Sequence, residues 1–496
     1  MALGIVLGLL AFSAFLAIRA PFRALVAAVF FAPWAGFDVD VGLRVTAYLI
    51  FLAPLVGVFL LSVIKGRHAR EALGSLGLLW LVIVYAVLWS LAQIPFLPEA
   101  AVAGGALRSP ELRAVVQIVM FFIMIAPVFL VPWLVRNLDQ VRYLVGTYLV
   151  SVVILASLGW VQLVIWVATG SDPIPIGFVD NLLGGAAGQR SGQFMFGGDV
   201  IFRMSAFGGE PRDLGAGLVV GLLFIQAGVR PRWRFASLVW PFLFVSMLAT
   251  FSTMALITWF GASLVQLVFR ERNNRSLREG IVAFNKRSLY IGIVLLVLIP
   301  GTFIAFPESR IVQVIELRTI ERVIGGSSAS GGGPAYLEDF NAAVIGFLRA
   351  SPAYALTGVG LGNAHLYADP FLPDYAVFYA GGTSFVAKSA GLRWISEIGV
   401  IGLSAFLIWW ASVIRRTARI TAYRSDTVDL GGIIQRAGWS LLAFWLVSGY
   451  VTSQFFLLTG VVLAVGQILR LSKEKGSYRS MPYQLGRGPQ ALQRLE

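Results

Sequence analysis

Long apolar runs separated by short polar connections dominate this chain of 496 residues. A helix that spans a membrane needs about 20 mostly apolar residues. No segment shows the alternation of a strand-rich region, so we expect an all-α polytopic membrane protein with about 12–13 transmembrane helices. The runs expected to span are 2–18, 24–37, 43–63, 75–93, 112–134, 143–169, 213–229, 235–249, 250–269, 288–306, 391–414, 433–451 and 454–470.

Two long polar stretches interrupt this pattern, and we call them the first outer segment (170–212) and the second outer segment (307–390). A connection of the second segment's length is usually functional or disordered. It keeps many apolar and aromatic residues, so we expect it to be folded and partly helical, with a helix ending at Ser351-Pro352. The expected parts are a transmembrane bundle (1–306), the large outer loop (307–390), C-terminal transmembrane helices (391–470) and a polar tail (471–496).

Composition supports the membrane assignment. Hydrophobic residues make up 58% of the chain and charged residues 13%, whereas a soluble domain is about half apolar and about a quarter charged. Cysteine is absent, which excludes disulfides, thiolate metal sites and thiol catalysis.

The net charge of +14 has a topological explanation. Most of the 39 basic residues lie in connections on one side of the predicted bundle. By the positive-inside rule that side is cytoplasmic, and both outer segments then face outward. Because this distribution accounts for the basic charge, we expect no nucleic-acid partner. The basic connections are 65–70, 136–142, 230–234, 270–287, 415–424 and the tail.

The first outer segment contains Arg190, Arg203, Glu210 and Arg212, and it runs directly into a predicted helix. One interpretation is a glycine-rich loop with an ordinary helix start, in which Asp213 caps free amides and Glu210 suits the positive helix end. The other is that the three arginines bind an anionic ligand, because guanidinium groups match phosphate oxygens bidentately.

The second outer segment has helical periodicity over 308–324, which places Arg318 and Arg322 one turn apart and off the apolar stripe. They could form a solvated face paired with Glu316 and Glu321, or they could bind phosphate. The sequence leaves both interpretations open.

His365 is one of two histidines, and the other, His68, lies among the basic residues of the opposite side. Histidines on opposite sides of a membrane cannot share a metal site. His365 is therefore a candidate acid or base, or a structural residue. The nearby glycine pattern at 358–362 does not follow a strand in a βαβ unit, so we do not expect a dinucleotide site.

Arg393 and Glu397 lie four residues apart at the start of an apolar span, just after Lys388. Ionisable residues in spans are costly and tend to face the bundle interior. They could form a mutual ion pair at the interface or take part in function.

At these positions the chain resembles the superfamily of O-antigen polymerases and O-antigen ligases. The layout is similar as well, with about twelve spans and one dominant periplasmic loop late in the chain. Three patches carry the likeness: 351–352 with 358–363, 392–403, and 190–194 with 207–211.

The resemblance implies a metal-independent membrane glycosyltransferase without a cofactor. It would polymerise undecaprenyl-diphosphate-linked repeat units into a surface or exported polysaccharide at the periplasmic face of the bacterial inner membrane. Preorganised cations would stabilise the diphosphate leaving group. The diphosphate-binding candidates are Arg190, Arg203, Arg212, Arg318, Arg322 and Arg393. Glu210 and His365 are the acid/base candidates, with Lys388 and Glu397 in support.

The resemblance leaves two alternatives open. Ligases of this superfamily usually have a histidine-asparagine pair where this chain has Lys388-Ser389, which favours a polymerase over a ligase acting on a lipid or protein acceptor. A transporter of polysaccharide or lipid-linked sugar would carry ionisable residues at the bilayer midplane, whereas here they collect in the outer segments. The expected partners are the lipid-linked donor, an acceptor sugar and membrane lipid, with a chain-length regulator as a further candidate.

Overall fold

The structure is a computed structural model of the chain. It describes residues 2–36, 38–40, 44–66, 74, 76–98, 110–170, 193–196, 199–208, 210–229, 236–271, 336–372, 387–422 and 430–474.

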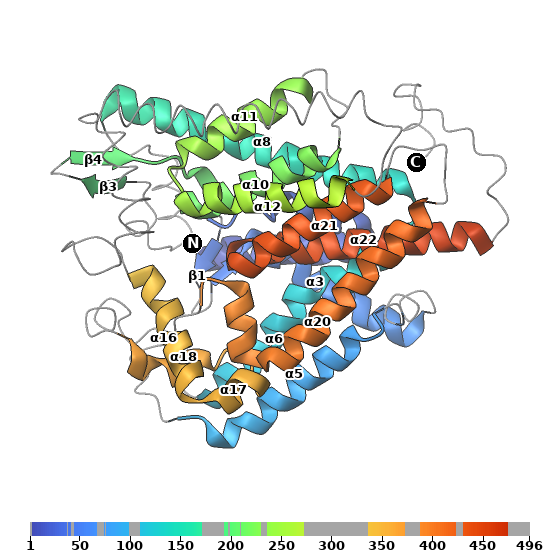
Figure 1. The fold of residues 1–496 in the computed structure, drawn as a ribbon. Helices are drawn as coiled ribbons and strands as arrows, with labels where there is room; N and C mark the ends of the chain where they lie inside the picture. Colours follow the sequence, from blue (N-terminus) through green and yellow to red (C-terminus); the bar gives the residue numbers. More distant parts are fainter. Residues whose placement is uncertain are drawn as a thin grey trace.

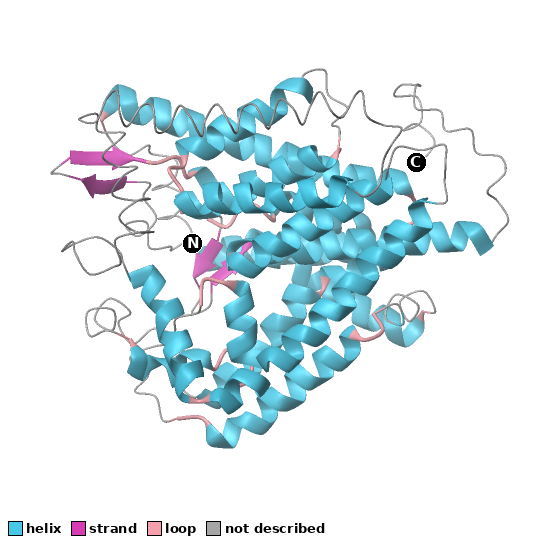
Figure 2. Ribbon diagram, in the orientation of Figure 1, coloured by secondary structure: helices cyan, strands magenta, loops and turns pink. Residues whose placement is uncertain are grey.

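The protein is an all-α polytopic membrane protein (Figure 2), as the hydrophobic pattern predicts. Its first helices are α1 (Ala2–Arg19), α2 (Pro21–Phe31), α3 (Ala47–Lys65), α5 (Leu79–Gln93), η1 (Ile94–Phe96), α6 (Pro110–Ile125), α7 (Pro127–Leu134) and α8 (Leu138–Thr169). Next come η3 (Ala206–Gly208), α10 (Pro211–Ala227), α11 (Ala236–Ala249) and α12 (Thr253–Glu271). The last are α16 (Tyr336–Ala350), α17 (Pro352–Thr357), α18 (Ala364–Ala368), η5 (Asp369–Phe371), α20 (Ala390–Ala422), α21 (Leu430–Val447), η6 (Gly449–Val451) and α22 (Thr452–Glu474).

Within the described residues, seven helical stretches are long and apolar enough to cross a membrane, and five shorter apolar helices accompany them. Twelve of the predicted runs coincide with helices within a few residues at most ends. The run 112–134 is divided into α6 and α7 because Pro127 cannot donate a backbone hydrogen bond. The predicted span 288–306 lies outside the described residues.

The described residues also contain two small antiparallel hairpins, which the sequence did not predict. They pair β1 (Asp38–Asp40) with β2 (Arg44–Thr46), and β3 (Gln193–Phe196) with β4 (Asp199–Phe202). Figure 1 shows β3, β4 and the α16–α18 region at the left end of the bundle, opposite the ends of α20 and α22. Parts of both outer segments therefore lie at one end of the molecule.

An aromatic core joins the C-terminal helices. The rings of Trp445 and Phe455 stack with centroids 4.5 Å apart, and Trp394 and Phe406 pack beside them. Burying such large side chains holds α20, α21 and α22 in a fixed arrangement.

A second, smaller core forms the α16–α18 lobe (336–372). Phe340, Val344 and Phe347 of α16 are buried in it. Helix α16 ends at Ala350, as expected from Ser351-Pro352, because the residue before a proline disfavours helical backbone. The described part of the second outer segment is thus folded and partly helical.

Candidate functional site

The start of α10 has a reciprocal cap. Pro211 occupies the first helical position, and Glu210 is the N-cap residue. Asp213 lies inside the helix, and its Oδ2 accepts a hydrogen bond from the Glu210 backbone N–H at 3.3 Å. The interpretation of Asp213 as the residue that caps the free amides is therefore wrong: the N-cap is Glu210, three residues earlier, because Pro211 is suited to the first helical position.

The Arg212 side chain connects this cap to η6. Its Nη2 lies 2.5 Å from Oε2 of Glu210. Its Cζ lies 4.9 Å from the centroid of the Tyr450 ring in η6. Because Arg212 is mostly buried, both the ion pair and the cation–π contact are stronger than they would be in bulk water.

Lys388 and Ser389, at the end of the second outer segment, contact the region of η6 as well. The Gly449 backbone N–H donates to the Lys388 carbonyl oxygen at 2.7 Å, and the Ser389 hydroxyl donates to the Leu446 carbonyl oxygen at 2.7 Å. Ser389 Oγ also accepts from the Leu392 N–H at 3.2 Å, so it caps the start of α20. Lys388 and Ser389 thus fix the first turn of α20 against η6.

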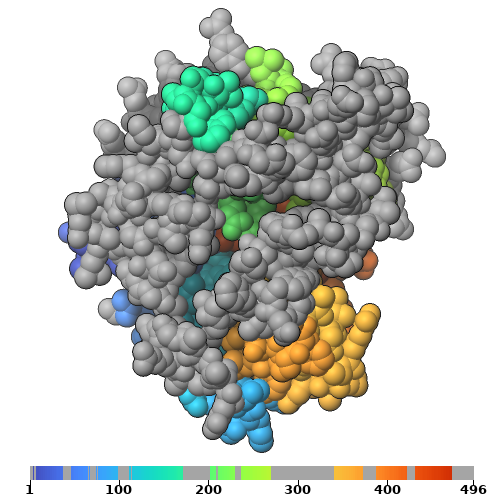
Figure 3. Space-filling view, turned by 90° about the vertical axis from the view of Figure 1, so that its left-hand side faces the viewer, coloured from blue at the N-terminus to red at the C-terminus, as the bar shows by residue number. Residues whose placement is uncertain are grey.

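The two outer segments therefore meet at η6. We call this meeting point the η6 cluster, defined by Glu210, Arg212, Lys388, Ser389 and Tyr450. Viewed from that end, green atoms of the 199–229 region lie near the centre, and gold to orange atoms of the 336–400 region lie below them (Figure 3).

An ion pair lies one turn further along α20. Arg393 Nε donates to Glu397 Oε1 at 2.9 Å, and the Arg393 N–H donates to the Ser389 carbonyl oxygen. The Glu397 side chain is 6% exposed and the Arg393 side chain 33% exposed. The mutual ion pair, one of the two interpretations of the sequence spacing, is present, and its arginine end remains accessible to solvent.

Helix α20 is broken immediately after this pair. Gly399 has φ 72° and ψ 173°, outside the helical region, and the orange ribbon changes direction sharply (Figure 1). An intact helix would bond the carbonyl oxygens of Ser396 and Glu397 to N–H groups four residues later. Instead they accept at 2.9 Å from the N–H groups of Val359 and Gly360, respectively.

The loop that fills this break is held from the other side by α5. The Leu361 N–H donates to Ser90 Oγ at 2.8 Å, Trp89 Nε1 donates to the Gly358 carbonyl oxygen at 2.9 Å, and the Tyr85 hydroxyl donates to the Thr357 carbonyl oxygen at 2.7 Å. The glycine pattern at 358–362 is thus a docking loop between α5 and α20. Its glycines have positive φ, and each has neighbouring atoms where a Cβ would lie: backbone of Glu397 at Gly358, the Ser90 Cα at Gly360 and the Gln117 side chain at Gly362.

His365 is buried in the α16–α18 lobe. The adjacent aromatic group consists of Phe347, Tyr354 and Tyr367, whose ring centroids are 5.3–5.9 Å apart. Burial and the neighbouring Tyr354 raise the pKa of Tyr367 to about 12. The lobe therefore holds His365 among packed side chains rather than at an open surface.

The remaining arginine candidates are placed differently. Arg203 is half-buried in the segment between β4 and η3, next to the buried Met204. Arg190, Arg318 and Arg322 lie outside the described residues. Of the six predicted diphosphate-binding arginines, Arg212 belongs to the η6 cluster and Arg393 lies one helical turn beyond it.

Sequence reasoning missed Tyr450 and the α5 residues that hold the docking loop. Tyr450 lies at the end of the predicted run 433–451, next to the short connection before 454–470, and its place on the same side as both outer segments was a usable signal. Ser90 gave no comparable signal, since a lone serine in a spanning helix is common.

No protein-family model matches the sequence, and no curated protein matches it significantly.

Proposed function

We propose that the protein is a membrane glycosyltransferase that polymerises undecaprenyl-diphosphate-linked repeat units, with the η6 cluster as part of its active site. The membrane would be the bacterial inner membrane, with this end of the bundle facing the periplasm. The observation that carries the proposal is the contact of both outer segments with η6, through Arg212 on one side and Lys388 on the other.

The resemblance noted from the sequence supports the same proposal. Two of its patches are bonded to each other where the docking loop satisfies the carbonyl oxygens of Ser396 and Glu397. The third patch ends at the α10 cap, which contacts η6 through Arg212. Described parts of motifs that are far apart in the sequence are thus joined to each other or to η6.

The proposed chemistry assigns a task to each group. An acceptor hydroxyl forms a bond to the anomeric carbon of the donor while the bond from that carbon to the diphosphate breaks. Glu210 takes the hydroxyl proton, and the lipid diphosphate leaves. Arg212 and Arg393 offset the negative charge that develops on the leaving group, with Arg190, Arg203, Arg318 and Arg322 as further candidates.

His365 is the second acid/base candidate in this proposal. Its burial requires the lobe to open before the imidazole can reach a substrate, whereas Glu210 needs no such movement. Glu210 is therefore the first residue to test. Lys388 and Glu397 support the site by fixing the start of α20 and orienting Arg393.

The test uses purified protein in detergent with a lipid-diphosphate-linked repeat unit and no other acceptor. A ladder of longer glycans on a gel supports the polymerase. Transfer in a single step, only after a lipid or protein acceptor is added, would make the protein a ligase. Uptake by proteoliposomes with no product from the native glycan would replace the enzyme with a transporter.

A further inference from the structure

A pocket of about 440 Å³ lies at the end of the bundle opposite the η6 cluster. It is formed where α1 turns into α2 and where α7 ends, before α8 begins. Both corners lie at the basic end, because α2 and α8 each lead from them to the hairpins at the other end. The residues that matter here are Pro21, Phe22, Arg23, Trp133, Leu134 and Arg136.

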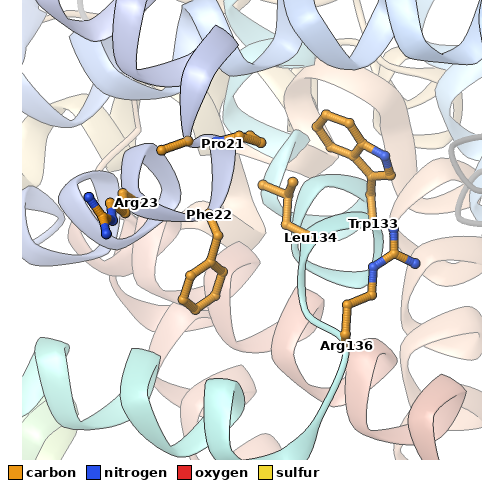
Figure 4. Close-up of a pocket in the computed structure, with 7 residues that line it drawn as sticks. Pro21, Phe22, Arg23, Trp133, Leu134 and Arg136 are labelled. Atoms are coloured by element: carbon orange, nitrogen blue, oxygen red, sulfur yellow. The ribbon is translucent and has the colours of Figure 1, made fainter. Parts of the chain in front are cut away.

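The pocket combines an apolar floor with a cationic rim. Figure 4 shows the guanidinium groups of Arg23 and Arg136 on opposite sides, with Phe22 and Leu134 between them. Trp133 makes an edge contact with Phe59, with ring centroids 5.2 Å apart. The floor is thus built from packed side chains rather than from loosely held ones.

The two arginines are available to a ligand. Both are exposed, and within the described parts of the chain neither guanidinium has an ion-pair partner. The nearby carboxylate of Asp139 is already paired with Arg142 at 3.0 Å. Two exposed cations therefore flank an apolar hollow at the end of a membrane bundle.

We propose that this pocket binds an anionic phospholipid of the leaflet at the basic end of the bundle. The lipid phosphate would lie between Arg23 and Arg136, and the first part of an acyl chain would lie against Phe22 and Leu134. Guanidinium groups match phosphate oxygens, and basic pockets between spanning helices bind anionic headgroups. A free phosphate would gain nothing from the apolar floor, so the structure favours a lipid.

Lipid retention in native mass spectrometry tests this proposal. The full-length protein is incubated with equal amounts of phosphatidylglycerol and phosphatidylcholine, and the ratio of bound lipids is measured. The wild type should prefer phosphatidylglycerol. Each arginine near a membrane surface contributes about a fivefold preference, so Arg23→Gln with Arg136→Gln should reduce the ratio by about 25-fold. Lysine at both positions keeps the charge and should retain most of the preference.

The matched control changes Arg415 and Arg416 to glutamine, because both are exposed on α20 at the same end but outside the pocket. An equal reduction of the lipid ratio in the control would show a general effect of charge and would overturn the proposed lipid site. An unchanged ratio in the Arg23/Arg136 variant would also overturn it. Displacement of the bound lipid by excess inorganic phosphate would identify a phosphate site instead of a lipid site.

Discussion

The guanidinium of Arg212 lies over the ring of Tyr450, with 4.9 Å between Cζ and the ring centroid. This contact joins the start of α10 to the turn between α21 and α22, residues more than two hundred positions apart. It gives the proposed active site a fixed cation at the point where the outer segments converge.

Replacing Arg212 with alanine should lower polymerisation by about 100-fold, because loss of one preorganised donor to a developing charge has effects of this size. Lysine keeps the charge but loses the planar fork, so Arg212→Lys should be intermediate. The measurement is the initial rate of ladder formation from the lipid-linked repeat unit.

The control for this series is Arg142→Ala, because Arg142 is an exposed arginine at the opposite end that forms an ion pair with Asp139 of its own helix. It should keep the wild-type rate. If Arg212→Ala polymerises as fast as the wild type, the η6 cluster does not hold the leaving group.

Adding a methyl group at Gly358 or Gly399 should destabilise the protein by about 3 kcal/mol or more. A Cβ at Gly358 would lie 2.3 Å from the Glu397 carbonyl oxygen, and one at Gly399 would lie 2.0 Å from the Leu356 carbonyl oxygen. Both glycines also have positive φ. The thermal unfolding midpoint of each alanine variant in detergent measures the effect.

Gly261→Ala is the matched comparison, since Gly261 lies in α12 and, apart from the neighbouring backbone of its own helix, no atom of the described residues lies within 4 Å of the added Cβ. It should leave stability unchanged or raise it by up to about 1 kcal/mol. A Gly399→Ala protein as stable as Gly261→Ala would contradict the docking-loop geometry.

The Arg393–Glu397 pair should respond unequally to truncation. Arg393→Ala leaves a carboxylate that is 6% exposed without its partner and should cost about 3 kcal/mol. Glu397→Ala leaves an arginine that can reach water, because it is 33% exposed, and should cost about 1 kcal/mol.

Unfolding midpoints of the two single variants and of Arg393→Leu with Glu397→Leu decide this point. The double variant should be more stable than Arg393→Ala, because it removes the buried charge together with its partner. A larger loss of stability for Glu397→Ala than for Arg393→Ala would contradict the finding that Glu397 is the buried member of the pair.

Ser90→Ala should destabilise the protein by about 1–3 kcal/mol, because the buried Leu361 N–H loses its acceptor. Ser62→Ala provides the comparison, since the Ser62 hydroxyl donates to the Val58 carbonyl oxygen of its own helix. The Ser62 variant should change stability by less than about 0.5 kcal/mol. Chemical denaturation of both variants gives the two free energies of unfolding. Equal losses of stability would show that the Ser90 hydrogen bond does not hold the docking loop.

Tyr367 should make the α16–α18 lobe sensitive to alkaline pH. Its pKa is raised to about 12 in the folded protein, so its contribution to stability is complete below about pH 10 and is lost as the pH rises through about 12. The absorbance titration of wild type minus Tyr367→Phe should show one phenol ionising near pH 12. A difference titration centred at pH 10 would show that the ring is solvated.

The spans were predictable because their signal is local: an apolar run of sufficient length leaves the chain few alternatives in a membrane. The break in α20 was not predictable from the sequence, because a glycine within an apolar run is compatible with a continuous helix. The carbonyl oxygens of Ser396 and Glu397 keep hydrogen-bond donors at the break because the docking loop, about forty positions earlier in the chain, supplies them. The hairpins were missed because strands of three or four residues are too short for their alternation to register.

The residues of the candidate site also fall into those that the sequence could predict and those that it could not. Arg212, Arg393 and Glu397 were identified because charges are conspicuous beside apolar helices. Tyr450 was missed because its role depends on a contact between distant segments, and a tyrosine at the end of a span is ordinary in membrane proteins.

The break at Gly399 also has a consequence for the order of biosynthesis. In hydrocarbon, backbone carbonyl groups without donors are costly. The donors for Ser396 and Glu397 come from residues 359 and 360, which leave the ribosome before α20 does. The docking loop that completes the hydrogen bonds of α20 has therefore already been synthesised when α20 emerges, so this helix can close its broken turn as soon as it is made.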